Sequence, residues 1–338
     1  MPTIKDIADE TGFSVATISR VLNQDQKFNV SDETRLKIMT AAEKMNYVPL
    51  NRRQKTDSSE PQKIDILSSS LSFCLVYWYD TQDELVDPYY LSIRLAIEQY
   101  CESRKISLQR FLFSQKNIEL LAESQFDGII ALGKFSPEEV HQLENLTPHC
   151  VLVDTYAKNY NLDVVLPTLK EATEDILAYF EEKGLTDAGF IGGQEKTLDG
   201  IPIAEVRLKT YRKWKFCQED AVYLGEFNAE SGYQLMKNII EGGNLKKAYL
   251  IASDAMAIGC LKALNEFHIS VPDEVSLISF NNISLSLYTI PALTTLDLNT
   301  QLLGETAASL LEERATSNRK IGKKIFIPTQ LTKRDSSK

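Results

Sequence analysis

Side chains that could hold a small polar ligand recur just after apolar runs of the sequence. Asp154 follows HCVLV, Asp254 follows YLIAS, and Asn281 follows VSLISF. Carboxylates and amides accept or donate hydrogen bonds in pairs, which suits a ligand rich in hydroxyl groups. An Asp in this position also commonly caps the next helix, so for Asp254 both interpretations stand.

Aromatic residues accompany these polar groups, and an aromatic face suits the C–H face of a sugar ring. Each could equally pack in the core, but their convergence with the polar groups favours a sugar site. The aromatic candidates are Trp78, Tyr79, Tyr89, Tyr90 and Phe227.

A second kind of chemistry is suggested at the N-terminus, where residues 3–23 predict two short helices joined by a tight turn. Thr3 and Asp6 form a capping pair, and Gly12 stands where the first helix must stop. The apolar stripe of this helix is Ile4, Ile7 and Ala8.

Ser14 is a good N-cap for the second helix, in which Val15, Ile18 and Leu22 lie on one side. This pattern is typical of a helix-turn-helix, although an ordinary helical hairpin has it too. On the exposed early face, methyl groups of Val15 and Ala16 could meet thymine, and Arg20 could bond guanine with two hydrogen bonds.

Residues 30–48 predict a third helix, and a polar stretch without periodicity follows. The basic residues Arg52, Arg53 and Lys55 suit phosphate contact or form a solvated cluster before a domain boundary. Residues 1–55 carry nine Lys/Arg and seven Asp/Glu, a net charge of +2. Because the whole chain carries −10, the remainder carries a net charge of −12. A basic head on an acidic body would turn the head toward DNA.

From position 72 onward, β-rich apolar runs alternate with helical patterns, which predicts parallel sheets covered on both faces in two α/β lobes. Ligands bind such sheets beyond the carboxyl ends of the strands. Strands are expected at 72–79, 106–113, 126–133, 149–154, 188–193, 221–227, 247–253 and 275–280, and helices at 88–105, 136–146, 169–184, 205–217, 229–243 and 254–267.

Bulk properties predict a cytoplasmic globular protein. The five cysteines are odd in number and lack C-x-x-C spacing, as expected of buried thiols in a reducing compartment. No apolar run reaches 18 residues and no export signal opens the chain. His141, His149 and His268 lack a partnered nucleophile motif, so we expect no enzyme, metal or cofactor.

Residues 3–23 and 30–49 together resemble the DNA-binding headpiece of the LacI/GalR family of bacterial transcription regulators. The resemblance implies operator contacts from the two helices and the basic run. In that family a hinge helix wedges a Leu into the minor groove, but Thr56 stands here in its place, so we expect no wedge. The DNA-contacting set expected is Thr3, Ser14, Val15, Ala16, Thr17, Ser19, Arg20, Asn23, Asn51, Arg52 and Arg53.

The resemblance continues through the body, in stretches that include 225–236, 253–264, 271–283 and 290–299. It implies a two-lobed domain similar to periplasmic sugar-binding proteins. By this resemblance Arg207 forks onto sugar hydroxyls and Phe227 stacks on the ring, while Ser253-Asp254 stands for the family's Asn-Asp pair. The effector set expected is Tyr79, Tyr89, Tyr90, Asp154, Arg207, Phe227, Ser253, Asp254 and Asn281.

We therefore predict a helix-turn-helix head (1–55), a linker (56–71) and a two-lobed effector and dimerisation domain (72–338). The predicted function is a dimeric repressor that binds a palindromic operator and responds to a small sugar. The stretch 84–99 favours a galactoside, since it resembles the branch that controls galactoside utilisation. The alternative is a cytoplasmic sugar-binding or sugar-processing protein whose head makes another contact.

Overall fold

The computed structural model describes residues 4–22, 30, 34, 37–38, 41, 71–79, 81–158, 161–197, 200–317 and 319–338. Internal contacts divide the chain into two units, Met1–Ser68 and Ser69–Lys338. Each unit is described by itself. The predicted linker, with Thr56, lies outside the described residues.

The first unit contains the two predicted short helices, α1 (Ile4–Thr11) and α2 (Val15–Leu22). Gly12 lies between them with φ +74°, a left-handed conformation that glycine adopts without steric cost. The Ser14 hydroxyl accepts a hydrogen bond from the Thr17 amide at 3.1 Å, so the predicted N-cap is confirmed. A small core forms from Ile7, Ile18, Val21, Ile38 and Ala41.

One detail of the predicted apolar face of α2 is wrong. Val15 is 48% exposed, and Val21 takes the buried position beside Ile18. Ile18 and Val21 pack with Ile7 of α1, whereas Val15 lies in the first turn of α2 and is not part of this small core. The side chain of Val15 is thereby left to the surface, as the base-reading prediction requires.

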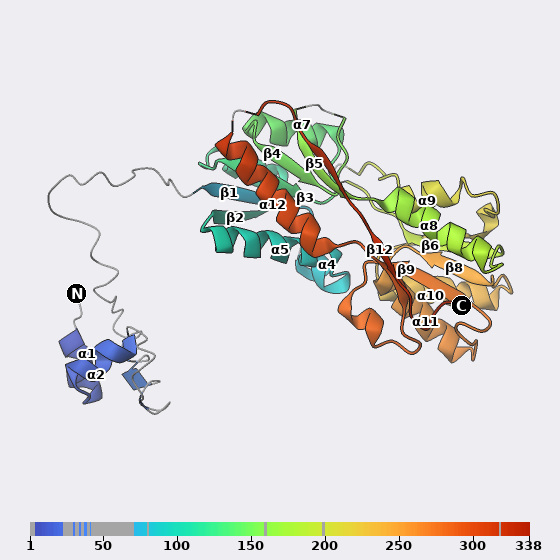
Figure 1. The fold of residues 1–338 in the computed structure, drawn as a ribbon, viewed down its shortest axis with the longest axis horizontal. Helices are drawn as coiled ribbons and strands as arrows, with labels where there is room; N and C mark the ends of the chain where they lie inside the picture. The colour runs from blue at the N-terminus through green and yellow to red at the C-terminus, as the bar shows by residue number, and fades with distance from the viewer. Residues whose placement is uncertain are drawn as a thin grey trace. The chain divides into compact units, whose positions relative to one another are not determined.

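The second unit consists of two lobes, each built on a six-stranded sheet (Figure 1). In the first lobe the strand order is β11-β5-β4-β3-β1-β2, and all pairs are parallel. Its strands are β1 (Ser72–Tyr77), β2 (Ser107–Leu112), β3 (Gly128–Leu132), β4 (Cys150–Val153), β5 (Asp163–Pro167) and β11 (Lys324–Ile327). Its helices are α4 (Thr81–Val86), α5 (Tyr89–Arg104), α6 (Gln115–Ala122), α7 (Pro137–Leu146) and α12 (Thr300–Thr316).

The second lobe repeats the design with strand order β12-β10-β9-β8-β6-β7, in which only β12 pairs antiparallel, with β10, among the described strands. Its strands are β6 (Ala188–Gly193), β7 (Val222–Gly225), β8 (Ala248–Ile251), β9 (Ser276–Phe280), β10 (Thr294–Asp297) and β12 (Gln330–Thr332). Its helices are α8 (Leu169–Glu182), α9 (Val206–Tyr211), α10 (Ala229–Glu241) and α11 (Asp254–Glu266), with short 3₁₀ turns at Glu219–Ala221 and Ser284–Leu287.

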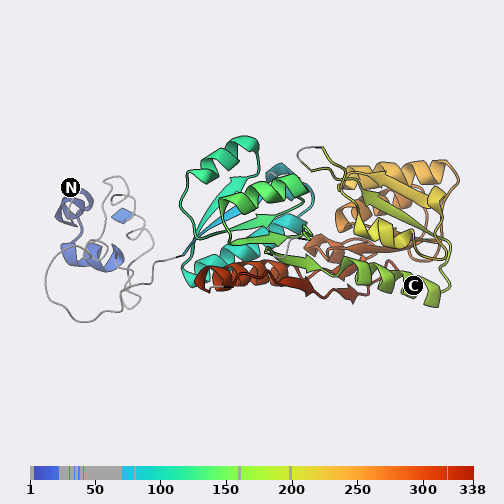
Figure 2. The same cartoon turned by 90° about the horizontal axis from the view of Figure 1, so that it is seen from above.

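The chain passes between the lobes three times: after β5, after β10 and after β11. Figure 2 shows its last part, in red, running along the first lobe as α12 and on into the second. Helix α12 packs beside α5, far away in sequence, and contributes Leu303, Ala307 and Leu311 to the first core. Both lobes are therefore completed by residues beyond position 300.

From position 72 onward the predicted strands are confirmed, and so are the predicted helices with one exception, whereas most of the third helix predicted in the head lies outside the described residues. The helix expected at 205–217 ends at Tyr211, because turns follow from Arg212 to Phe216. Gly184 lies just past α8 with φ +69°, as its predicted role at the helix end requires. The prediction omitted α4, α6, β5, β10, α12, β11 and β12.

All five thiols are unpaired, and all but the half-buried Cys217 are buried. Burial raises the pKa of Cys74 and of Cys150 to about 12, which makes these thiols poor nucleophiles. Within the described ranges, every helix is too short or too polar to cross a bilayer.

Candidate functional site

A central pocket lies between the two lobes, at the carboxyl ends of strands from both sheets. Residues that lie one or two positions past the end of a strand line this pocket, as expected for parallel sheets. The strands concerned are β1, β3, β4, β6, β7, β8 and β9. Its lining residues are Tyr79, Asp87, Tyr89, Tyr90, Lys134, Asp154, Leu169, Glu195, Ile203, Ala204, Glu205, Val206, Arg207, Phe227, Ser253, Asn281 and Leu298.

The central pocket encloses about 60 Å³, and flanking cavities of about 420 and 470 Å³ share its walls. A space of this size holds roughly four water molecules. A bound sugar would therefore need the lobes to part slightly, or would extend into a flanking cavity.

The Arg207 guanidinium is held by Glu205, two residues before it. Nε donates to Oε1 and Nη2 to Oε2, both at 2.7 Å, and Nη1 donates to the Ala252 carbonyl at 2.5 Å. Burial alone would raise the pKa of Glu205, but the charge and hydrogen bonds of Arg207 outweigh it and the pKa is lowered. The fork that the resemblance assigned to sugar hydroxyls is thus already occupied by a carboxylate.

Phe227 lies against this guanidinium, with 5.4 Å between its ring centroid and Arg207 Cζ. A Cβ atom added at Gly193, the last residue of β6, would come within 2.2 Å of the ring. Only glycine therefore allows the ring to approach the strand end.

Lys134 and Asp154 form the corresponding pair on the first lobe. Lys134 Nζ lies 2.9 Å from Asp154 Oδ2 and also donates to the Asp154 carbonyl at 2.7 Å. The Tyr90 hydroxyl donates to the same Oδ2 at 2.7 Å. Asp154 adopts φ +65°, a left-handed conformation that is costly for most residues and concentrates at functional sites.

Hydrogen bonds join the lobes across the pocket. The Tyr79 hydroxyl donates to Glu195 Oε1 at 2.9 Å, and Asn281 Nδ2 donates to Asp87 Oδ1 at 3.4 Å. Burial raises the pKa of Asp87 and of Glu195, although neighbouring positive charge and hydrogen bonds oppose the rise. Two acidic groups that are costly to ionise therefore sit at the lobe boundary.

Asp254 does not line the central pocket, although the sequence predicted a ligand contact for it. Its side chain is fully buried, and its carboxylate accepts from Ser279 Oγ at 2.5 Å, Thr295 Oγ1 at 2.6 Å and the Ile283 amide at 2.8 Å. The helix cap is the neighbouring Ser253, whose hydroxyl accepts from the Met256 amide. Asp254 therefore ties α11 to the turn that follows β9.

The structure brings the other predicted effector residues together around the central pocket: Tyr79, Tyr89, Tyr90, Asp154, Arg207, Phe227, Ser253 and Asn281. Sequence reasoning missed Asp87, Lys134, Glu195 and Glu205. Lys134 and Glu195 come two positions after a strand, so the strand-end rule could have found them. Glu205 carries no such signal, since only the fold shows that it faces Arg207.

In the head, Ser14, Val15 and Arg20 are exposed and Thr17 is half-buried, all on the start or outer side of α2. Ala16 and Ser19 lie in the same helix. Thr3, Asn23, Asn51, Arg52 and Arg53 lie outside the described residues, as do Leu50 and Lys55.

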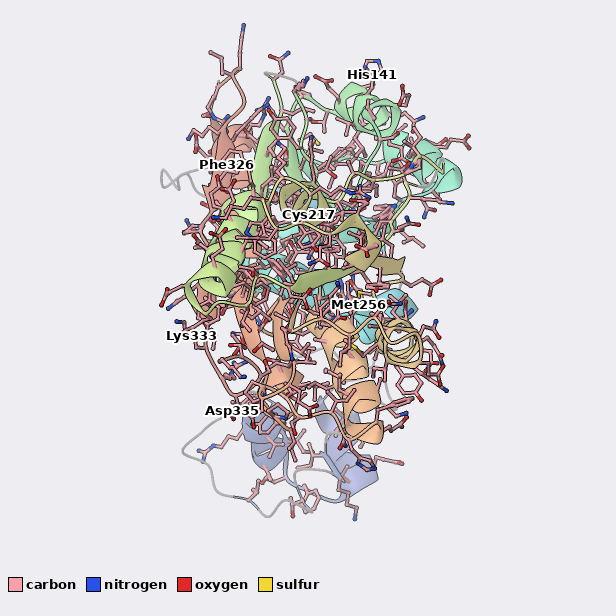
Figure 3. The ribbon with its side chains drawn as sticks, turned by 90° about the vertical axis from the view of Figure 1, so that its right-hand side faces the viewer. His141, Cys217, Met256, Phe326, Lys333 and Asp335 are labelled. Carbon is pink, nitrogen blue, oxygen red and sulfur yellow. The ribbon has the colours of Figure 1, made fainter. Side chains whose placement is uncertain are left out.

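The histidines lie away from the central pocket. Figure 3 shows His141 pointing outward from α7 at the edge of the molecule. His149 is exposed and its ring nitrogen lies 2.8 Å from the Asp127 carbonyl, while His268 follows the end of α11. In the described part of the chain no His, Cys, Asp and Glu side chains cluster in a way that could hold a metal ion.

Comparison with known proteins agrees with both parts of the chain. Residues 3–50 match the family described as bacterial regulatory proteins, lacI family, and residues 177–337 match the periplasmic binding protein-like domain. The HTH-type transcriptional regulator GanR of Bacillus subtilis (strain 168) is 37% identical over 344 residues, covering 99% of each chain. The chain belongs to the LacI family. The regulator GalR of Lacticaseibacillus casei is 35% identical over 344 residues and covers 100% of both chains.

The fold is also that of LacI family members of known structure. A Lac repressor dimer bound to its operator and the anti-inducer ONPF matches 99% of each chain with a TM-score of 0.71 and 21% identity. As a LacI family member, the chain is a DNA-binding transcriptional regulator, and the non-DNA role for its head is not favoured.

Proposed function

We propose that this regulator represses a sugar-utilisation operon, and that a galactose-type sugar bound in the central pocket changes its affinity for operator DNA. The observation that supports this proposal most directly is the central pocket. It places carboxylates, an amide and a hydroxyl around aromatic faces, at the boundary where two lobes can move. The stretch 84–99 and the likeness to GanR and GalR support a galactoside.

In this proposal the head spans residues 1–55, the linker 56–71 and the effector domain 72–338. The base-reading residues are Val15, Ala16 and Arg20, and the remaining predicted DNA contacts position the head on phosphates. The protein acts in the cytoplasm, where the operator is, and binds its sugar without turnover.

A homodimer follows from an exposed apolar surface on the second lobe. Between β9 and β10, Leu285, Tyr288 and Ile290 are 62%, 77% and 94% exposed. Large apolar side chains gathered on one segment mark a contact surface, and a twofold dimer would bury the same segment from both subunits. Two heads on such a dimer match a palindromic operator.

The test measures operator binding by fluorescence anisotropy, with DNA from upstream of the gene, in the presence and absence of galactose, lactose and melibiose. We expect one of these sugars to change the operator Kd at least about fivefold, the usual lower range of allosteric coupling. Phe227→Ala should lose this response and keep its sugar-free Kd. Phe216→Ala, an exposed aromatic outside the pocket, is the matched control. An unchanged Kd with every sugar, in the wild type, would refute the proposal.

A further inference from the structure

The central pocket has more acidic than basic side chains. Among its lining residues four carboxylates, Asp87, Asp154, Glu195 and Glu205, face two cations, Lys134 and Arg207. All six side chains are buried or half-buried, so solvent screens them weakly. With all four carboxyl groups ionised, a ligand group that enters this space meets two more negative than positive charges.

Both cations are already engaged by the protein's own carboxylates. Arg207 gives two of its donors to Glu205 and a third to a carbonyl oxygen. Lys134 lies against Asp154 through a carboxylate oxygen and the backbone carbonyl. Arg207 keeps two of its five N–H donors, but Glu205 occupies its two-bond fork, so an entering anion would either displace this carboxylate or bind directly beside it.

The helix N-terminus at the pocket offers no substitute, although such ends commonly bind phosphate. Ser253 begins α11 at the pocket wall, but its hydroxyl already accepts from the Met256 amide. The first turn of α11 also carries the buried carboxylate of Asp254. The positive end of this helix therefore already has an acidic side chain of the protein beside it.

Hydroxyl groups suit this lining in a way that a phosphate does not. A hydroxyl donates a proton to a carboxylate and can also accept from an amide or a guanidinium. A phosphate ester dianion only accepts hydrogen bonds and repels carboxylates. We infer that the central pocket admits only sugar units without a phosphate group, an inference that rests on the sugar site proposed above.

The inference places the effector in a reaction sequence. The recognised compound is a sugar before phosphorylation, so a phosphoryl transfer onto one of its hydroxyls would remove it as a signal. Lys170 and Lys196 line only the flanking cavities, so the restriction applies to the sugar unit in the central pocket.

The experiment is calorimetric competition on the full-length protein. Galactose, galactose 1-phosphate, galactose 6-phosphate and 6-O-acetylgalactose compete against whichever of galactose, lactose and melibiose binds. We expect both phosphate esters to compete at least about 100-fold more weakly than galactose, since like-charge contact costs several kcal/mol. The acetyl ester is the size control and should compete more strongly than the 6-phosphate.

A charge variant separates electrostatics from shape. Glu205→Gln should reduce the difference in binding affinity between galactose and galactose 6-phosphate at least about tenfold, because it frees the Arg207 fork. Glu195→Gln makes the same test without altering the start of α9. Glu219→Gln, which breaks the exposed Glu219–Arg212 pair, should leave the affinity difference unchanged.

Three results would overturn the inference. Phosphate esters that compete as well as galactose would refute it and leave the sugar site standing, and so would an acetyl ester as weak as the phosphate. An affinity difference that no pocket variant reduces would refute the electrostatic cause. If no sugar in the panel binds at all, the proposed function itself fails.

Discussion

Asp254→Ala distinguishes a buried structural anchor from a ligand contact. The Ile283 amide is fixed by the backbone, and the loss of its acceptor costs about 1–3 kcal/mol. The hydroxyls of Ser279 and Thr295 can rotate toward other acceptors, which limits their loss to about 1 kcal/mol each. The expected destabilisation is about 3–5 kcal/mol.

In a domain of this size each kcal/mol lowers Tm by about 2 °C, so we expect a fall of about 6–10 °C. The assay is thermal unfolding followed by circular dichroism at pH 6, with sugar calorimetry at 20 °C on the same samples. Sugar affinity should stay within about tenfold of the wild type, because the carboxylate does not reach the central pocket. Asp273→Ala, an exposed acid on the same lobe, should leave Tm unchanged. A variant with wild-type Tm and no sugar binding would make Asp254 a ligand contact and refute this reasoning.

Four further predictions follow from the site and the head. Burial raises the pKa of Asp254 to about 7, so the folded protein holds a proton that the unfolded chain loses, and stability should fall as pH rises from about 4 to 7; chemical denaturation should show a shallower fall in Asp254→Asn, with Asp87 and Glu195 supplying the rest. Arg20→Ala should weaken operator binding by about 1–3 kcal/mol and relax preference at one position per half-site, and equal affinity and selectivity at matched salt would exclude this role. Ile290→Glu should shift the dimer to monomer in analytical ultracentrifugation, whereas an unchanged sedimentation coefficient would place the interface elsewhere. Because Thr56 replaces the wedging Leu, circular-permutation mobility should show little operator bending. Leu50 is the nearby apolar residue that could still wedge, so a bend of about 40° or more that is lost in Leu50→Ala would restore the wedge.

The sequence indicated eight strands, and most of these are short, continuous apolar runs buried on both faces, whereas β2 and β7 are partly exposed. Strand β3 is an example, with every residue from Gly128 to Leu132 buried. The elements that escaped prediction have weaker patterns for physical reasons. Helix α12 buries small residues such as Gly304 and Ala308 on its core face and leaves Leu302 45% exposed, so the contrast between its apolar and polar faces is weak. Strands β10 and β12 are short, and β10 begins with two buried threonines.

The candidate site was predictable where position alone decides, at the ends of parallel strands. Asp154 and Asn281 were found in this way, and both line the pocket. The rule failed for Asp254, because a residue after a strand can point down into the lobe as well as outward. It could not reveal the Glu205–Arg207 pair either, since that geometry depends on the turn into α9.

The three passages between the lobes also set the order in which the protein can mature. The core of the first lobe needs Leu303, Ala307 and Ile327, and the second lobe needs the buried Ser336, which bonds to Leu277 and Thr294. Neither lobe can close while these residues are still inside the ribosome. The small core of the first unit does not depend on late residues, because its described members, from Ile7 to Ala41, all belong to Met1–Ser68. During synthesis a DNA-binding head can thus form well before the body that regulates it, and pairing through the second lobe must wait until nearly the whole chain has emerged.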